Sequence, residues 1–303
     1  MTHGFRRIPD QGPWPLDPES FNLFLFGGST AFGFNIKDDE TIAAYLQQTL
    51  NKKYKNHKIS VYNFGQSGYY STQERILFER LLAHGNIPHA AIFLDGLNDF
   101  FNREDTPFFV NNSYSEILDK HFMLRFLDRL NKYFNPINNI REHLEKFERY
   151  KLSPHTKRYY WDNPKEREKK FNDRPILEKV IKTFLNNASI AEATGKSFGV
   201  KVGFFWQPIP HYNGDKKYLP FYGLLSERHL YSEFGYKLFR KKIDSGLVKL
   251  PSRFGWLADI QKETEGFLYV DAVHYSPEIS KAIAQYISEY LVSWNVLPSN
   301  LDE

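Results

Sequence analysis

The sequence of 303 residues contains no cysteine. The chain therefore cannot form disulfides, use a thiolate nucleophile or bind zinc or an iron–sulfur cluster through sulfur. It also lacks any apolar run approaching the roughly 18–20 residues of a membrane-spanning helix, and its first residues lack the apolar core of a signal peptide. We expect the chain as given to be soluble, without a transmembrane segment.

A strong charge of one sign is absent too, because the net charge is only +4. Its basic excess lies between residues 151 and 174, in a mixed-sign run typical of a solvated surface. No helix–turn–helix, RNA-binding or finger pattern accompanies this run, which argues against a nucleic-acid partner. No His or Glu pair at metal-ligating spacing stands out among the ten histidines, so we predict neither a metal nor a cofactor.

Aromatic residues are abundant, at 17% of the chain, and apolar runs recur between glycine-rich turns. Mainly apolar runs without regular polar alternation predict buried strands at 21–26, 59–64, 90–94, 200–206 and 267–270. Helices are predicted over 41–54, 176–194 and 278–291, and Ser71 is expected to cap another that ends at Ala83, with Glu74 completing a capping box. Alternating strands and helices predict a doubly wound α/β fold with a parallel sheet.

The alternation breaks between residues 100 and 175, where the sequence becomes aromatic, polar and helix-like, with helices expected over 117–134 and 137–150. We expect one domain over residues 1–303, with this segment inserted as a helical cap at the strand ends. Insertions at that edge often determine specificity, although a structural addition or an oligomer contact is an equal alternative.

Ser29 is the candidate nucleophile because it follows Gly27 and Gly28 at the end of the first predicted strand. Ligands of open α/β sheets bind at that edge, where glycines bring backbone amides close to a substrate oxygen. The alternative is an ordinary strand-to-helix turn with Ser29 or Thr30 as the helix N-cap.

Asp271 and His274 follow the last predicted strand, and their spacing lets the carboxylate orient one imidazole nitrogen. An oriented histidine is the general base that a serine nucleophile needs. The tetrahedral oxyanion that then forms needs hydrogen-bond donors. The amides of Ser29 and Gly68 and the side chain of Asn98, all expected at the same edge, are the candidate oxyanion hole.

Four sequence blocks carry a resemblance to the SGNH hydrolase superfamily, also called GDSL-type esterases. They are Gly-Gly-Ser-Thr at 27–30, Asn-Phe-Gly-Gln-Ser-Gly at 63–68, Gly-Leu-Asn-Asp at 96–99 and Asp-Ala-Val-His at 271–274. The resemblance implies a flavodoxin-like five-stranded parallel sheet, a Ser29–His274–Asp271 triad and an oxyanion hole of Ser29, Gly68 and Asn98. The chain is most similar to a bacterial branch with Gly-Gly-Ser-Thr in place of Gly-Asp-Ser. Members of that branch commonly carry an N-terminal membrane anchor, so an extracytoplasmic location is expected.

Further candidates surround this site. Tyr69, Phe100, Gln207 and His211 are predicted to contact the substrate, by stacking on a ring or lining the pocket, whereas Asp99 is expected to hold its loop. We expect a serine esterase that acts on a small acyl ester, above all an O-acetyl group on a carbohydrate. The alternatives are an O-acyltransferase that uses the same acyl-enzyme and a non-catalytic glycan- or partner-binding module.

Overall fold

The computed structural model describes residues 6–104, 163–214, 227–262 and 264–298. The helices predicted over 117–134 and 137–150 lie outside these residues. The chain divides into two compact units, Met1–Arg103 with Glu168–Glu303, and Glu104–Arg167. The first unit contains the sheet and all the candidate site residues. One domain over 1–303, with an insertion at 100–175, stays a prediction.

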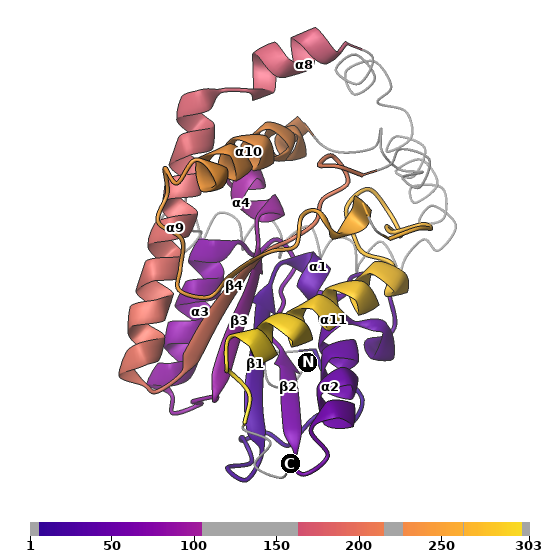
Figure 1. Ribbon diagram of the computed structural model, residues 1–303, viewed down its shortest axis with the longest axis vertical. Helices are drawn as coiled ribbons and strands as arrows, with labels where there is room; N and C mark the ends of the chain where they lie inside the picture. The colour runs from indigo at the N-terminus through magenta and orange to yellow at the C-terminus, as the bar shows by residue number, and fades with distance from the viewer. Residues whose placement is uncertain (1–5, 105–162, 215–226, 263, 299–303) are drawn as a thin grey trace, which may run out of the picture. The chain divides into compact units, whose positions relative to one another are not determined.

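A five-stranded parallel sheet lies at the centre of the first unit (Figure 1). Its strands are β1 (Phe21–Gly27), β2 (Ile59–Asn63), β3 (Ala90–Asp95), β4 (Lys201–Trp206) and β5 (Phe254–Trp256). They are arranged in the order β2-β1-β3-β4-β5, and every pairing is parallel. This is the flavodoxin-like strand order, so the predicted fold class is confirmed.

The position predicted for the fifth strand was wrong. β5 is the three-residue segment Phe254–Trp256, which extends the sheet beside β4 with Trp256 opposite Trp206. The segment 267–270 instead forms only an isolated antiparallel bridge, between Tyr269 and Tyr275. That bridge closes a tight turn, which contains Asp271 and His274.

The sheet separates an aliphatic core from an aromatic one. Helices α2 (Ile42–Lys53) and α11 (Pro277–Ser293) cover one face, and α3 (Ser71–Ala83) and α9 (Arg174–Ser197) cover the other (Figure 1). Leu23 and Leu25 of β1 pack in the aliphatic core, whereas the ring of Phe26 stacks on Phe93 with centroids 4.8 Å apart. Burial on both faces explains why β1 has no polar alternation.

The remaining described elements are short or lie near the strand ends. They are α1 (Ser29–Phe32), α4 (Leu97–Phe101), α8 (Pro164–Phe171), α10 (Glu227–Asp244) and two 3-10 turns, Asp38–Glu40 and Ile260–Lys262. The capping box predicted for α3 was wrong, because Tyr70 is its N-cap and Glu74 is buried beside other carboxyl groups. Among the described helices, none is long and apolar enough to cross a membrane.

Candidate active site

The carboxyl ends of β1 and β3 bring the candidate nucleophile and a predicted oxyanion donor to one place. The chain order reverses here, because β2 and β3 lie on opposite sides of β1. Ligands of doubly wound sheets bind in the crevice at such a reversal. Ser29 begins α1 two residues after β1 ends, and Asn98 lies in α4, which follows β3. Gly28 is the N-cap of α1, so neither Ser29 nor Thr30 serves as the cap.

Ser29, His274 and Asp271 form a continuous chain of hydrogen bonds. The Oγ of Ser29 lies 2.8 Å from Nε2 of His274, and the Nδ1 of His274 lies 2.7 Å from Oδ2 of Asp271. In this geometry the carboxylate accepts the Nδ1 proton, which leaves Nε2 free to accept the serine proton. The arrangement can therefore make the Ser29 hydroxyl nucleophilic.

The turn around Asp271 fixes the carboxylate and keeps it ionised. Its Oδ1 accepts hydrogen bonds from the backbone amides of Val273, at 3.0 Å, and His274, at 2.9 Å. Burial alone would raise the pKa of Asp271, but the hydrogen bonds from the His274 ring and these two amides outweigh it and lower the pKa well below its ordinary value. An anionic Asp271 can stabilise the imidazolium that forms during catalysis.

Asn98 lies against the backbone that leads into the nucleophile. Its Nδ2 donates to the carbonyl of Tyr69 at 2.7 Å, which leaves its second N–H for another acceptor. A Cβ added to Gly28 would lie only 2.3 Å from that Nδ2, so the absence of a side chain at position 28 allows the close approach. Gly68 precedes Tyr69 and has φ of +80°, a left-handed conformation that favours glycine. The contact of Asn98 with Tyr69 therefore joins one predicted oxyanion donor, Asn98, to the loop that contains another, Gly68.

Asp99 holds the two loops of the predicted oxyanion hole together. Its Oδ1 accepts a 2.6 Å hydrogen bond from the hydroxyl of Ser71, at the start of α3, and its Oδ2 accepts from the amide of Gly96. Glu74 and Asp95 are also buried here. Burial raises the pKa of all three carboxyl groups, and for Glu74 the negative charges of Asp95 and Asp99 raise it further.

The residues predicted to contact substrate differ in how deeply they are buried. Phe100 is fully buried against Trp206 and Tyr236, so it belongs to the core and cannot stack on a substrate ring. Gln207 is only 2% exposed and is bonded within the protein, which leaves its side chain little access to a substrate. His211 is buried as well, whereas Tyr69 is half-buried beside Gly68.

Three residues near the triad carried no sequence signal. Phe34 is 42% exposed, and its ring centroid lies 4.7 Å from that of His274, so it offers an apolar surface at the catalytic base. Asn35 donates from Nδ2 to Oδ2 of Asp271 at 3.0 Å. Burial and the charge of nearby His274 lower the pKa of His229, on α10, to about 4. His229 is therefore a neutral imidazole near the site at pH 7.

In the described ranges, no group of three or more His, Asp or Glu side chains is arranged to hold a metal ion. The arrangement around Ser29 has the parts of an acyl-transfer site, namely a candidate nucleophile, a candidate base and an oriented carboxylate. The expected absence of a cofactor stays a prediction.

Comparison with family models and with curated proteins finds no match. Several solved structures align over most of the chain. One, a proposed lipolytic protein of the G-D-S-L family from Desulfitobacterium hafniense, is 14% identical, with a TM-score of 0.43 over 90% of this chain and 100% of its own. The esterase EstA from Pseudoalteromonas sp. is 10% identical, with a TM-score of 0.47 and coverage of 91% and 99%. An acetyl xylan esterase variant from Geobacillus stearothermophilus is 15% identical, with a TM-score of 0.43 and coverage of 89% and 94%. Similarity at this level does not decide the reaction or the substrate.

Proposed function

We propose that the chain is a serine esterase of the SGNH type that removes a small acyl group, above all acetyl, from a carbohydrate. The observation that carries the proposal is the hydrogen-bonded chain from Ser29 through His274 to Asp271. These residues come from opposite ends of the sequence, and their order resembles that of the blocks of that superfamily. A carboxylate-oriented histidine within bonding distance of a serine is the arrangement that nucleophilic acyl transfer needs.

Acylation begins when Nε2 of His274 takes the Ser29 proton as Oγ attacks the ester carbonyl carbon. The carbonyl oxygen becomes an oxyanion, which the amides of Ser29 and Gly68 and the Nδ2 of Asn98 stabilise. The bond to the alcohol oxygen then breaks, and His274 returns its proton to that oxygen. The products are a free alcohol and an acyl group bonded to Ser29.

Deacylation repeats these steps with water. His274 takes a proton from water as the water oxygen attacks the acyl carbon. The bond between the acyl carbon and Ser29 Oγ then breaks, and His274 returns the proton to Oγ. The carboxylic acid leaves, and the enzyme is restored. Asp271 stays anionic throughout and stabilises the imidazolium in both halves of the reaction.

The substrate proposal rests on the side chains around the triad. Phe34, with an exposed ring beside His274, and half-buried Tyr69, next to Gly68, offer faces on which a sugar ring can stack. Asn35 and Asn98 add amide groups to the same region. A polar and aromatic surface suits an acylated carbohydrate better than a long fatty acyl chain.

Hydrolysis of p-nitrophenyl acetate, butyrate and octanoate by the wild type and by folded Ser29→Ala tests this proposal. We expect the highest kcat/KM on acetate and a loss of about 10⁴-fold or more in the variant, as for other serine nucleophiles. Preference for octanoate would contradict the small-acyl proposal. Turnover by Ser29→Ala at the wild-type rate would contradict the serine mechanism. Transfer of acetyl to an added xylo-oligosaccharide, in place of its release as acetate, would identify an acyltransferase.

A further inference from the structure

The loop that follows α1 contacts the acid and the base of the triad. Phe34 packs its ring against His274, and Asn35, the next residue, donates to Oδ2 of Asp271. That oxygen also binds the Nδ1 of His274, so one loop supports both members of the pair. Asn35 has φ of +65°, a left-handed conformation that few residues except Gly, Asn and Asp adopt readily. The direction of its amide therefore depends on how this loop is held.

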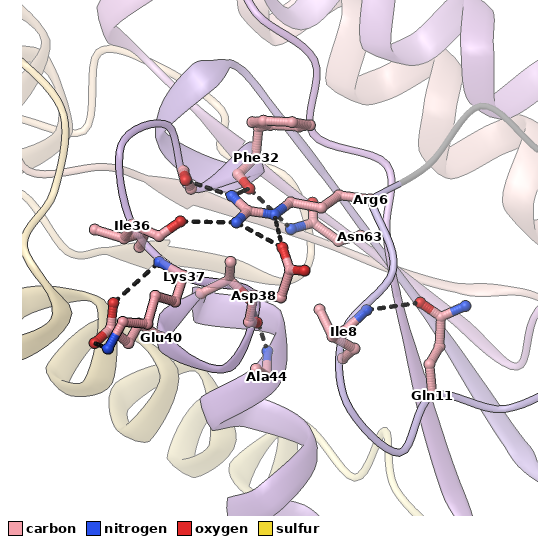
Figure 2. Close-up of polar contacts among 12 residues, drawn as sticks. Arg6, Ile8, Gln11, Phe32, Ile36, Lys37, Asp38, Glu40, Ala44 and Asn63 are labelled. Carbon is pink, nitrogen blue, oxygen red and sulfur yellow. Dashed lines mark hydrogen bonds and ion pairs between the residues drawn. The ribbon is translucent and has the colours of Figure 1, made fainter. Parts of the chain in front are cut away.

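Arg6, from the segment before β1, makes polar contacts with the residues that flank Phe34 and Asn35 in this loop (Figure 2). Its guanidinium donates to the carbonyls of Phe32, at 2.9 Å, and Ile36, at 2.8 Å, and also to the carbonyl of Gly33. Its Nε donates to Oδ1 of Asp38 at 2.7 Å. These acceptors precede and follow Phe34 and Asn35, so a single side chain fixes the loop at both ends.

Contacts with β2 and with the Phe32 ring hold Arg6 itself in position. Its backbone amide donates to the carbonyl of Asn63 at 3.0 Å, in an isolated bridge with the end of β2. The side chain of Asn63 in turn donates to the carbonyl of Ala31, in the helix that Ser29 begins. The Arg6 side chain is only 13% exposed, and its guanidinium carbon lies 5.0 Å from the Phe32 ring centroid. Water is therefore partly kept from the hydrogen bonds to the three carbonyls, which strengthens them, whereas the Asp38 side chain is 64% exposed.

The chemistry of this contact requires a guanidinium. Arginine presents five N–H donors in a fixed planar fork, whereas lysine offers one ammonium group on a flexible stem. Three carbonyls and a carboxylate lie around Arg6, and no single ammonium position satisfies all four. An arginine can therefore serve as a rigid brace for a loop that has no regular secondary structure of its own.

We infer that Arg6 is a positioning residue, which orients the Asp271–His274 pair through Asn35 and Phe34. The inference rests on the proposed esterase function. Displacement of catalytic groups by about 1 Å can lower a rate by about 100-fold, so a loosened loop should reduce the chemical step more than substrate binding.

Four variants test this inference: Arg6→Ala, Arg6→Lys, Asn35→Gly and the double variant Arg6→Ala/Asn35→Gly. Glycine at position 35 removes the amide while it tolerates the left-handed backbone, so this variant tests the contact without strain. On p-nitrophenyl acetate we expect kcat to fall about 10-fold in each alanine or glycine variant, with KM within about twofold. The double variant should fall little further, because both changes act on one contact. Arg6→Lys should lie between the wild type and Arg6→Ala.

Arg7→Ala is the matched control, since Arg7 is the adjacent arginine but is exposed to solvent. The Nδ1 proton of His274, measured by NMR, gives a readout independent of turnover. We expect its signal to be kept in the wild type and Arg7→Ala and to shift or broaden in Arg6→Ala and Asn35→Gly. If Arg6→Ala does not fold, Asn35→Gly and Arg6→Lys decide the question.

A folded Arg6→Ala or Asn35→Gly with the kcat and the His274 signal of Arg7→Ala would overturn the inference. The inference would also be contradicted if the fold-decreases in kcat of the two single variants multiply in the double variant. That result would show that Arg6 and Asn35 act independently. If the wild type itself hydrolyses no ester, the proposed function fails. The NMR comparison then still decides whether Arg6 positions His274.

Discussion

The hydroxyl of Thr30 donates a 2.7 Å hydrogen bond to Oε1 of Gln207, and both side chains are buried. The hydroxyl of Tyr275 lies 3.1 Å from the same oxygen and 2.7 Å from the carbonyl of Pro208. Thr30 follows the proposed nucleophile, and Tyr275 follows the proposed base. One amide from the end of β4 therefore connects the backbone segments that carry Ser29 and His274.

Replacing Gln207 by leucine should lower both stability and turnover. Loss of the amide leaves the buried Thr30 hydroxyl without its acceptor, which costs about 1–3 kcal/mol in the free energy of unfolding. We also expect a lower kcat, because Ser29 and His274 lose their shared connection. Leu50→Ala, in the aliphatic core on α2, is the control: it should lose about 2–5 kcal/mol of stability with no change in kcat. Wild-type kcat in folded Gln207→Leu would contradict this role.

Two glycines with nearly the same backbone allow a direct test of the oxyanion hole. Gly68 and Gly85 have φ of +80° and +78°, and an added Cβ would meet no atom within 4 Å at either position. Alanine should therefore cost each variant about 1–2 kcal/mol of stability through backbone strain alone. Only Gly68→Ala should also lower kcat on p-nitrophenyl acetate, by about 10²-fold or more if its amide is displaced from the oxyanion. Equal kcat in the two variants would contradict the expectation that a side chain at position 68 disturbs the oxyanion hole.

The buried carboxyl of Glu74 should make stability depend on pH. Its raised pKa means that the folded chain keeps a proton on Glu74 where the unfolded chain has lost it, above about pH 4.3. The stability that protonated Glu74 contributes is fully present below the pKa of the unfolded chain, about 4.3, and is lost as pH rises through the raised pKa of the folded chain. Glu74→Gln stays neutral, so its stability relative to the wild type should increase with pH, by up to about 1.4 kcal/mol per unit.

Urea unfolding between pH 4 and 8 measures this difference. Glu79→Gln is the control on the same helix, because Glu79 is partly exposed and pairs with Arg75. Its stability relative to the wild type should vary little with pH. A pH-independent difference for Glu74→Gln would show that Glu74 is ionised in the folded protein.

Much of this architecture was predictable from sequence because it depends on local patterns. The first four strands were readable as mainly apolar runs that are followed by glycine or polar residues. β5 was missed because its three residues, Phe254–Trp256, include a glycine and are too short to show a pattern. The apolar segment 267–270 was mistaken for that strand, although its role is to hold the turn with Asp271 and His274.

Contacts between distant segments could not be predicted in the same way. Phe100 looked like a candidate to stack on substrate, but Gly235 on α10 allows its ring to pack inside: a Cβ there would lie 2.1 Å from that ring. Arg6 and Asn35 left no signal, because their contacts span many residues. Arg6 binds backbone carbonyls and Asp38, and Asn35 binds Asp271. Spacing along the chain shows which residue types are available, and only the folded chain shows which of them meet.

Covalent labelling of Ser29 is the most direct test of the proposed mechanism. The wild type, Ser29→Ala and His274→Ala are each treated with diisopropyl fluorophosphate, which captures activated serines. Intact-mass and peptide mass spectrometry then locate the adduct. We expect one adduct per wild-type chain, on Ser29, and no adduct at that rate in either variant. An adduct at another serine, such as exposed Ser67, or equal labelling of Ser29 in His274→Ala, would contradict the proposed triad.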